Sequence, residues 1–216
     1  MDACLALKQP TLVRREVATL TVSYKSQSDH DLIELTRKGE ESAYAEIVAR
    51  YQNPLTNYLY RMLNDYEEAV DLTQEAFVRV YLAIERYHSG YAFSTYIYRI
   101  ATNLAITELR KRKRRKLFSL TGLFQFDGDE EVEFQPPDKR ETPDLETVNK
   151  EKSVVIGKAI AALPDKYRAP IILREIQELS YEEIAEILEL GLGTTKSRIS
   201  RGRGLLRDRL KDYLGR

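Results

Sequence analysis

Residues 180–201 read SYEEIAEILELGLGTTKSRISR. Ser180 and Glu183 have the spacing of a capping box, which predicts the start of a short helix. Residues 189–193 contain two glycines and predict a turn, after which Thr194 predicts the N-cap of a longer helix. Two helices joined by a tight glycine-containing turn, the second of them basic, are typical of a helix-turn-helix. The alternative interpretation is an ordinary helical hairpin with a solvated basic face.

The helix predicted after Thr194 carries the side chains that such a motif uses. In a helix-turn-helix the second helix lies in the major groove of DNA, and its first turns reach base edges. The candidates for that role are Lys196, Ser197, Arg198 and Arg201. Phosphates are the expected targets further along, at Arg203, Arg207 and Arg209. Gly202 and Gly204 interrupt this helix, and each weakens it by about 0.8 to 1 kcal/mol relative to alanine.

Charge is distributed unevenly along the chain. The 216 residues carry 34 basic and 34 acidic side chains, so the formal net charge is zero. Acidic residues predominate between residues 29 and 87, whereas residues 110–116 are seven consecutive bases. Residues 193–211 form a second basic stretch. Separate stretches of opposite charge predict surfaces with different partners, and a balanced total does not exclude nucleic acid.

The N-terminal half of the chain shows apolar residues at helical spacing. We expect helices over 31–38, 41–62, 66–87 and from about Ser94 into the basic run. Asn53 and Pro54 predict a break or kink in the second of these helices. Asp65 and Glu68 resemble a capping box at the start of the third.

The chain divides into two helical parts with a different composition between them. Residues 28–116 and 148–216 each show helical periodicity, and neither shows strand alternation of useful length. Residues 117–147 hold glycines, prolines and many acids, and predict a flexible acidic linker. Residues 1–27 show no clear period and are interpreted as an N-terminal extension. The predicted fold class is therefore all-α, with two helical domains, the second a helix-turn-helix.

Composition excludes several classes of protein. One cysteine and two histidines cannot form a disulfide framework or a zinc site of the usual kind. No apolar run approaches the roughly 18 residues of a membrane span, and residues 1–10 lack the pattern of a signal peptide. We expect a cytoplasmic protein without membrane insertion and without a cofactor.

Aromatic side chains gather beside the first basic run. Tyr87, His88 and Tyr91 flank a short polar loop, and the helix after it continues into residues 110–116. Rings next to positive charge are typical of single-stranded DNA binding, because bases stack on rings while basic groups neutralise phosphates. The alternative is that most of the rings belong to the core, as is expected of Phe93 and Tyr96.

The helix predicted over residues 66–87 has a second face, which lies outside its apolar stripe. The residues at three- and four-residue steps on this face are Asp71, Gln74, Glu75, Val78 and Leu82. Polar and aliphatic groups mixed on one face suggest a protein-binding surface. Packing within the molecule is an equally good interpretation.

Three segments together resemble a known family. They are residues 71–81 (DLTQEAFVRVY), residues 93–103 (FSTYIYRIATN), and the region from Leu163-Pro164 through residues 179–185 to residues 193–198. In this order and spacing they resemble the extracytoplasmic-function (ECF) sigma factors, small two-domain members of the primary sigma family. The resemblance covers about residues 28–116 and 148–212.

The resemblance implies a bacterial initiation factor that directs core RNA polymerase to promoters and promotes strand opening. The residues implied to bind core polymerase, through its β′ clamp and β subunits, are Asp71, Gln74, Glu75, Val78 and Leu82. Those implied to contact the minus-ten element are Tyr87, His88, Ser89, Gly90, Tyr91, Asn103, Arg110 and Arg112. Those implied to read the minus-thirty-five element are Thr195, Lys196, Ser197, Arg198, Arg201 and Arg203. An anti-sigma factor is the further implied partner.

Two other functions compete with this interpretation. A two-domain regulator would use the helix-turn-helix on operators, but it leaves the aromatic and basic region 91–116 without a role. Binding to core polymerase distinguishes the two. A nucleic-acid enzyme would need a catalytic motif, and the sequence has no H-E-x-x-H, no Walker loop and no Cys/His cluster. We therefore expect no enzymatic activity.

Overall fold

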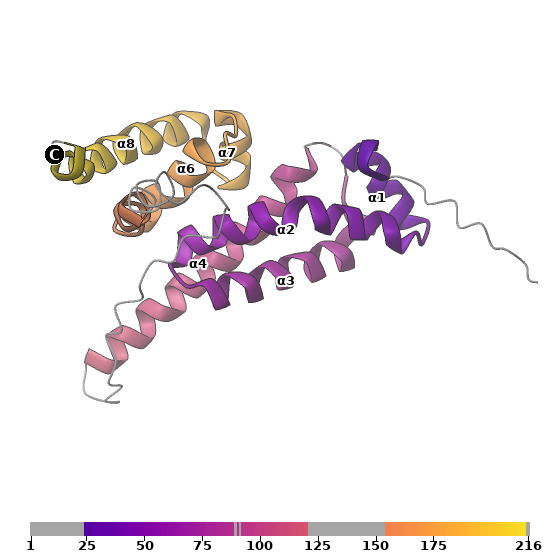
Figure 1. Cartoon of the computed structure of the whole chain (residues 1–216), viewed down its shortest axis with the longest axis horizontal. Helices are drawn as coiled ribbons and strands as arrows, with labels where there is room; N and C mark the ends of the chain where they lie inside the picture. Colours follow the sequence, from indigo (N-terminus) through magenta and orange to yellow (C-terminus); the bar gives the residue numbers. More distant parts are fainter. Residues whose placement is uncertain (1–23, 89, 91, 121–153, 215–216) are drawn as a thin grey trace, which may run out of the picture.

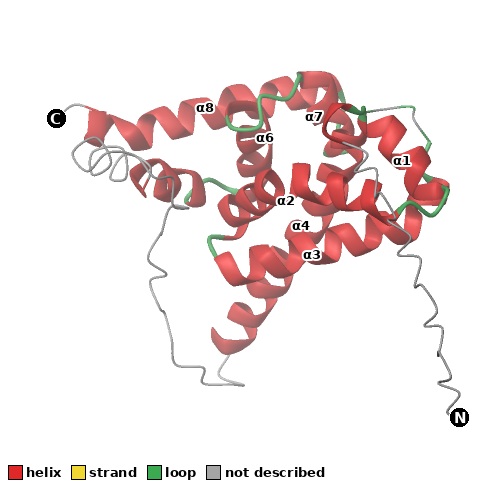
Figure 2. Ribbon diagram, turned by 45° about the vertical axis from the view of Figure 1, so that its right-hand side comes forward, coloured by secondary structure: helices red, strands yellow, loops and turns green. Residues whose placement is uncertain are grey.

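The computed structural model describes residues 24–88, 90, 92–120 and 154–214, and all regular structure among them is helical (Figures 1 and 2). The elements are η1 (Tyr24–Ser26), α1 (Asp29–Arg37), α2 (Glu41–Leu63), α3 (Tyr66–Ala83), η2 (Ile84–Arg86), α4 (Phe93–Leu120), a helical stretch over 154–161, α6 (Asp165–Glu175), α7 (Tyr181–Ile187) and α8 (Leu192–Leu214). The predicted all-α class is confirmed.

The N-terminal helices pack around α2, which contacts α1, α3 and α4. Leu55, Tyr58 and Ile97 are fully buried in this core. The Tyr58 hydroxyl hydrogen bonds to that of Thr102 at 2.8 Å, which satisfies two polar groups that would otherwise be costly to bury. Burial also raises the pKa of Tyr58 above its ordinary value. The core therefore holds α2 and α4 in a fixed register.

The helix caps and the helix break predicted for the N-terminal domain agree only in part with the structure. Ser28 and Asp31 form a capping box at the start of α1. Asp65 caps α3 by accepting from the Glu68 amide at 3.1 Å, but the reciprocal bond of a capping box is absent from the α3 cap. α2 continues through Pro54, so the expected break does not interrupt it. Burial of the residues after the proline, such as Leu55, offsets the lost backbone bond.

Two expected boundaries are corrected by the helices. Residues 24–26 form η1, and Arg50 donates to the carbonyls of Tyr24 and Lys25, so the end of the expected extension 1–27 belongs to the fold. α4 reaches Leu120, so the first residues of the expected linker 117–147 are helical. The rest of that linker lies outside the described residues.

The C-terminal domain contains the predicted helix-turn-helix. Ser180 Oγ accepts from the Glu183 amide at 3.1 Å, and the Ser180 amide donates to the Glu183 carboxylate at 2.8 Å, so the capping box of α7 is confirmed. α8 begins at Leu192, so Thr194 lies in its first turn and the prediction of an N-cap there is wrong. Glu189 lies in the turn between α7 and α8, and its backbone adopts the left-handed region with a φ of 52°.

α8 crosses α6 at Gly202, and this approach leads to a stability prediction. A Cβ at Gly202 would lie 2.6 Å from Ile171 Cγ1, and Ile171 is fully buried. A Cβ at Gly204 would meet nothing within 4 Å. We expect Gly202→Ala to destabilise the domain by about 1 to 3 kcal/mol through overpacking, and Gly204→Ala to stabilise α8 by up to about 1 kcal/mol.

The measurement is chemical denaturation of the full chain followed by circular dichroism. Gly204→Ala is the matched control, because it makes the same chemical change on the same helix two residues away. Equal shifts for the two variants would contradict the close contact between α6 and α8.

The two domains contact each other: α6 packs against α2 and α7 against α4 (Figure 1). Arg168 of α6 donates to the Met62 carbonyl at the end of α2 at 2.8 Å. Tyr98 of α4 donates its hydroxyl to Gln177. These contacts place α7 beside the first turns of α4, next to the loop between residues 87 and 92.

Candidate functional site

The first candidate surface is the outer face of α3. Its apolar side is buried in the bundle, with Ala76 fully enclosed. The five residues predicted to bind core polymerase are all exposed: Asp71, Gln74, Glu75, Val78 and Leu82. Val78 is 56% exposed and Leu82 77%, and both stand on the same face of α3. Packing within the molecule, the alternative for this face, does not occur among the described residues.

Sequence reasoning left one residue of this face out. Tyr81 is 49% exposed, and its ring packs against Tyr44 with the centroids 5.0 Å apart. It stands three residues after Val78, so the helical spacing that selected the other five could have found it. With Val78 and Leu82 it forms the apolar part of the face.

The second candidate surface begins at the loop after η2. Tyr87 is only 9% exposed, because its ring packs against Phe93 and Tyr96, and burial raises the pKa of its hydroxyl. In this structure the ring is therefore not available for contact with DNA, which corrects the expectation for Tyr87. His88 and Gly90 are exposed. Ser89 and Tyr91 lie outside the described residues.

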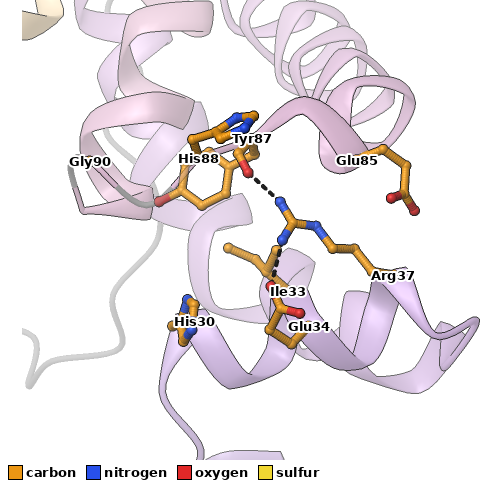
Figure 3. Close-up of a pocket in the computed structure, with 8 residues that line it drawn as sticks. All are labelled: His30, Ile33, Glu34, Arg37, Glu85, Tyr87, His88 and Gly90. Atoms are coloured by element: carbon orange, nitrogen blue, oxygen red, sulfur yellow. Dashed lines mark hydrogen bonds and ion pairs between the residues drawn. The ribbon is translucent and has the colours of Figure 1, made fainter.

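Two hollows adjoin this loop. One, of about 480 Å³, lies between the loop and α1 and includes His88, Gly90 and Arg37 in its lining (Figure 3). The other, of about 230 Å³, includes His88, Tyr96 and Arg99. Glu186 of α7 also lines this second hollow, where its carboxylate lies 3.4 Å from the Arg99 guanidinium.

A polar stripe runs from the second hollow along α4. Its members, at three- and four-residue steps on one side of the helix, are Tyr96, Arg99, Asn103, Thr107, Arg110 and Arg114. Asn103, Thr107, Arg110 and Arg114 are exposed, while Tyr96 and Arg99 are half-buried. The stripe joins an aromatic ring to positive charge along one line, which suits a single strand of nucleic acid.

The seven basic residues at 110–116 are not equivalent. Glu108 is buried, and its carboxylate pairs with Lys111, Arg112 and Arg115. Arg112 also pairs with Asp65 at 2.9 Å and donates to the Leu63 carbonyl, so it fastens α4 to the turn between α2 and α3. This role corrects the expectation that Arg112 contacts DNA.

Arg110, in contrast to the half-buried Arg112, is exposed. With Lys113 and Arg114, it makes no ion pair with any described residue. These three side chains are the part of the basic run that remains for phosphates.

The third candidate surface is the start of α8. Lys196, Ser197 and Arg201 are exposed, and Arg198 is half-buried. Arg203 pairs with Glu175 of α6 at 2.7 Å, so part of its charge is already neutralised within the domain.

Thr195 is fully buried, and its hydroxyl donates to the Gly191 carbonyl at 3.3 Å. The expectation that Thr195 reads DNA is therefore corrected: its side chain stabilises the turn before α8.

Comparison with known proteins assigns the family. Residues 47–115 match the model of Sigma-70 region 2, and residues 153–206 match that of Sigma-70, region 4. Over 185 residues the chain is 40% identical to the ECF RNA polymerase sigma factor SigW of Bacillus subtilis, with 83% of this chain and 95% of the relative covered. The chain belongs to the ECF RNA polymerase sigma factors. The sigma factor is also 32% identical over 192 residues to the RNA polymerase sigma-H factor of Pseudomonas aeruginosa, which covers 87% and 96% of the two chains.

Solved structures share the fold of this sigma factor. The sigma factor RpoE in complex with the anti-sigma factor NepR from Bartonella quintana aligns with a TM-score of 0.61 at 24% identity, covering 78% of this chain and 96% of that one. CnrH in complex with the cytosolic domain of CnrY aligns with a TM-score of 0.61 at 19% identity, covering 85% and 97%. Among the described helices, none has the length and apolarity needed to cross a membrane.

The function implied by the sequence resemblance is confirmed. The sigma factor is a transcription initiation factor that binds core RNA polymerase and directs it to specific promoters. An operator-binding regulator, the first competing interpretation, does not account for the match to region 2.

Proposed function

We propose that each of the three surfaces described above binds a different partner of this sigma factor. The exposed face of α3 docks on core polymerase, through the β′ clamp. The loop after Tyr87, with the exposed His88 and Gly90, and the stripe on α4 capture the opened minus-ten strand. The N-terminal half of α8, through Lys196, Ser197, Arg198 and Arg201, reads the minus-thirty-five duplex. Arg203 serves there as a weaker phosphate contact.

The observation that carries this proposal is the continuity of the stripe on α4. It leads from the hollow beside His88 to the exposed bases at Arg110 and Arg114 without an acidic residue of α4 among its members. A base extruded from a duplex costs a few kcal/mol, which stacking and phosphate neutralisation along such a stripe can offset. Strand opening can therefore be driven by binding alone, and the protein needs no catalytic site for it.

The proposal predicts slower opening of the promoter duplex when a side chain of the loop or of the α4 stripe is removed. His88→Ala and Asn103→Ala should each slow opening of a duplex promoter several-fold, as the loss of one base contact implies. They should have much less effect on a template already mismatched across the minus-ten region, because opening is no longer required. The measurement is run-off transcription with core polymerase on both templates.

Asn53→Ala is the matched control for Asn103→Ala, because Asn53 is also an exposed asparagine but lies on α2. It should behave like the parent on both templates. Equal defects of His88→Ala and Asn103→Ala on the duplex and the mismatched template would count against base capture.

Regulation by an anti-sigma factor completes the proposal. Support comes from the RpoE structure of similar fold, which is a complex with the anti-sigma factor NepR. We place the protein in the cytoplasm, where RNA polymerase acts, as an initiation factor without enzymatic activity.

A further inference from the structure

We infer that Arg37 of α1 is a positioning residue that fixes where the minus-ten loop begins. The inference rests on the proposed function of the loop after Tyr87 in capturing the opened strand. It assigns to α1, which belongs to none of the three proposed surfaces, a part in promoter recognition.

Arg37 holds the end of η2 from the side. Its guanidinium donates to the Ile84 carbonyl through Nε at 3.0 Å and through Nη2 at 2.9 Å. Nη2 also donates to the Tyr87 carbonyl, as Figure 3 shows. Nη1 donates to Glu34, one turn earlier on α1. The planar fork is thus held on one side by a carboxylate and on the other by two main-chain carbonyls.

Both carbonyls lie at the C-terminal end of η2: that of Ile84 also accepts from the Tyr87 amide at 3.2 Å, and that of Tyr87 lies just beyond the last residue of the helix. The last carbonyls of a helix need partners from elsewhere, and a positive charge at a helix C-terminus is favourable. A guanidinium has several donors in one fixed plane, whereas an ammonium is a single point of charge. Arginine can therefore bridge Ile84 and Tyr87 in a way that lysine cannot.

The bond to Tyr87 fixes the point at which the loop begins. The Tyr87 ring is fixed by Phe93 and Tyr96, while its carbonyl is fixed by Arg37. His88, the next residue, is exposed. Arg37 and the aromatic rings together determine the direction in which the chain leaves Tyr87, and so where His88 and Gly90 stand at the hollow of about 480 Å³.

α1 is itself fastened at its other end. Arg50 of α2 pairs with Asp29 at 2.9 Å, and the Tyr51 hydroxyl donates to the same carboxylate. Arg37 therefore ties the loop to a helix that is anchored on the core of the domain. Arg50 is a comparable half-buried arginine with carbonyl and carboxylate acceptors, but it acts at the far end of α1.

The test compares base discrimination in Arg37→Lys and Arg50→Lys. Full-length variants are assembled with core polymerase, and the probes are labelled single-stranded oligonucleotides carrying the non-template minus-ten sequence of a promoter chosen by run-off selection. Each position is substituted in turn, and the ratio of affinities for the parent and substituted strands is measured. Arg37→Lys should reduce the largest ratio about tenfold, while Arg50→Lys should leave it unchanged.

This ratio of affinities distinguishes a change in loop position from a loss of folded protein. Both strands titrate the same active molecules, so an inactive fraction lowers both signals and leaves the ratio intact. Glu34→Gln is a second variant that keeps the Arg37 bonds to the carbonyls and removes only the carboxylate that orients the guanidinium. It should move the ratio in the same direction as Arg37→Lys but less, and thermal melts should show it folded.

The outcomes separate this inference from the proposed function. An unchanged ratio in both folded Arg37→Lys and Glu34→Gln would overturn the positioning role, even if His88→Ala and Asn103→Ala impair opening. Unchanged opening in His88→Ala and Asn103→Ala would overturn the proposed loop function instead. A reduced ratio in Arg50→Lys equal to that in Arg37→Lys would also overturn the inference, because the effect would then follow from loosening α1 as a whole.

Discussion

The double variant Glu75→Arg/Val78→Asp is expected to bind core RNA polymerase about 100-fold more weakly than the parent, because a few central side chains carry most of the energy of a protein interface. Val78 is 56% exposed on a face where Tyr81 and Leu82 are also exposed. An aspartate there would place a charge in an interface that has to exclude water. Reversal at Glu75 removes its bond to Arg79 and changes the charge that faces the partner.

Competition with labelled parent protein for core polymerase measures this effect. Glu41→Arg is the control, because it reverses an exposed acid of the same domain outside the α3 face. Circular dichroism of both variants should match that of the parent, since the substituted side chains are exposed. Parent-like affinity in the double variant would place the docking surface elsewhere on the molecule.

The second large effect is expected on α8, where Arg201→Ala should relax the preference for one base pair of the minus-thirty-five element. An arginine bonded to a guanine at two atoms contributes about 1 to 3 kcal/mol of discrimination, which corresponds to about 5- to 150-fold in affinity. Arg207→Ala should instead lower affinity for all sequences alike and reduce the salt slope by about 0.9, because a phosphate contact carries no base information.

Binding curves against duplexes substituted at single positions, at several salt concentrations, distinguish these outcomes. Arg203→Ala serves as an internal comparison: its guanidinium pairs with Glu175 at 2.7 Å, so its loss should change the salt slope less than the loss of Arg207. If Arg207→Ala altered a base preference while Arg201→Ala altered none, α8 would enter the groove in another register.

Local signals predicted the helix-turn-helix well because they act over three or four residues. The capping box of Ser180 and Glu183 formed as its spacing indicates. The start of α8 was misplaced because Thr194 has the side chain of a good N-cap, whereas the helix already begins at Leu192. The folded turn shows this, because the Gly191 carbonyl accepts from both the amide and the hydroxyl of Thr195. Gly202 looked like a weakness of the helix, but its lack of a side chain is what lets α8 approach Ile171.

Contacts between distant parts of the chain could not be found in this way. Arg112 belongs to an unbroken basic run, and nothing in that run indicates that Asp65, 47 residues away, neutralises it. The acceptors of Arg37 at Ile84 and Tyr87 are main-chain carbonyls, which every residue possesses and which therefore leave no pattern in the sequence. The candidate surfaces were predictable as faces of helices, but the supports that hold them were not.

The ion pair between Glu186 and Arg99 makes the two surfaces that we propose to bind DNA unequal in the free protein. A strand lying along α4 has to displace the Glu186 carboxylate from Arg99, whereas Lys196 and Arg201 are exposed as they stand. The apparent affinity for the strand is therefore the intrinsic affinity multiplied by the fraction of molecules in which this contact is open. A partner that binds better when the two domains are apart raises that fraction without contacting DNA. By reciprocal linkage, the bound strand then raises the affinity of the protein for that partner.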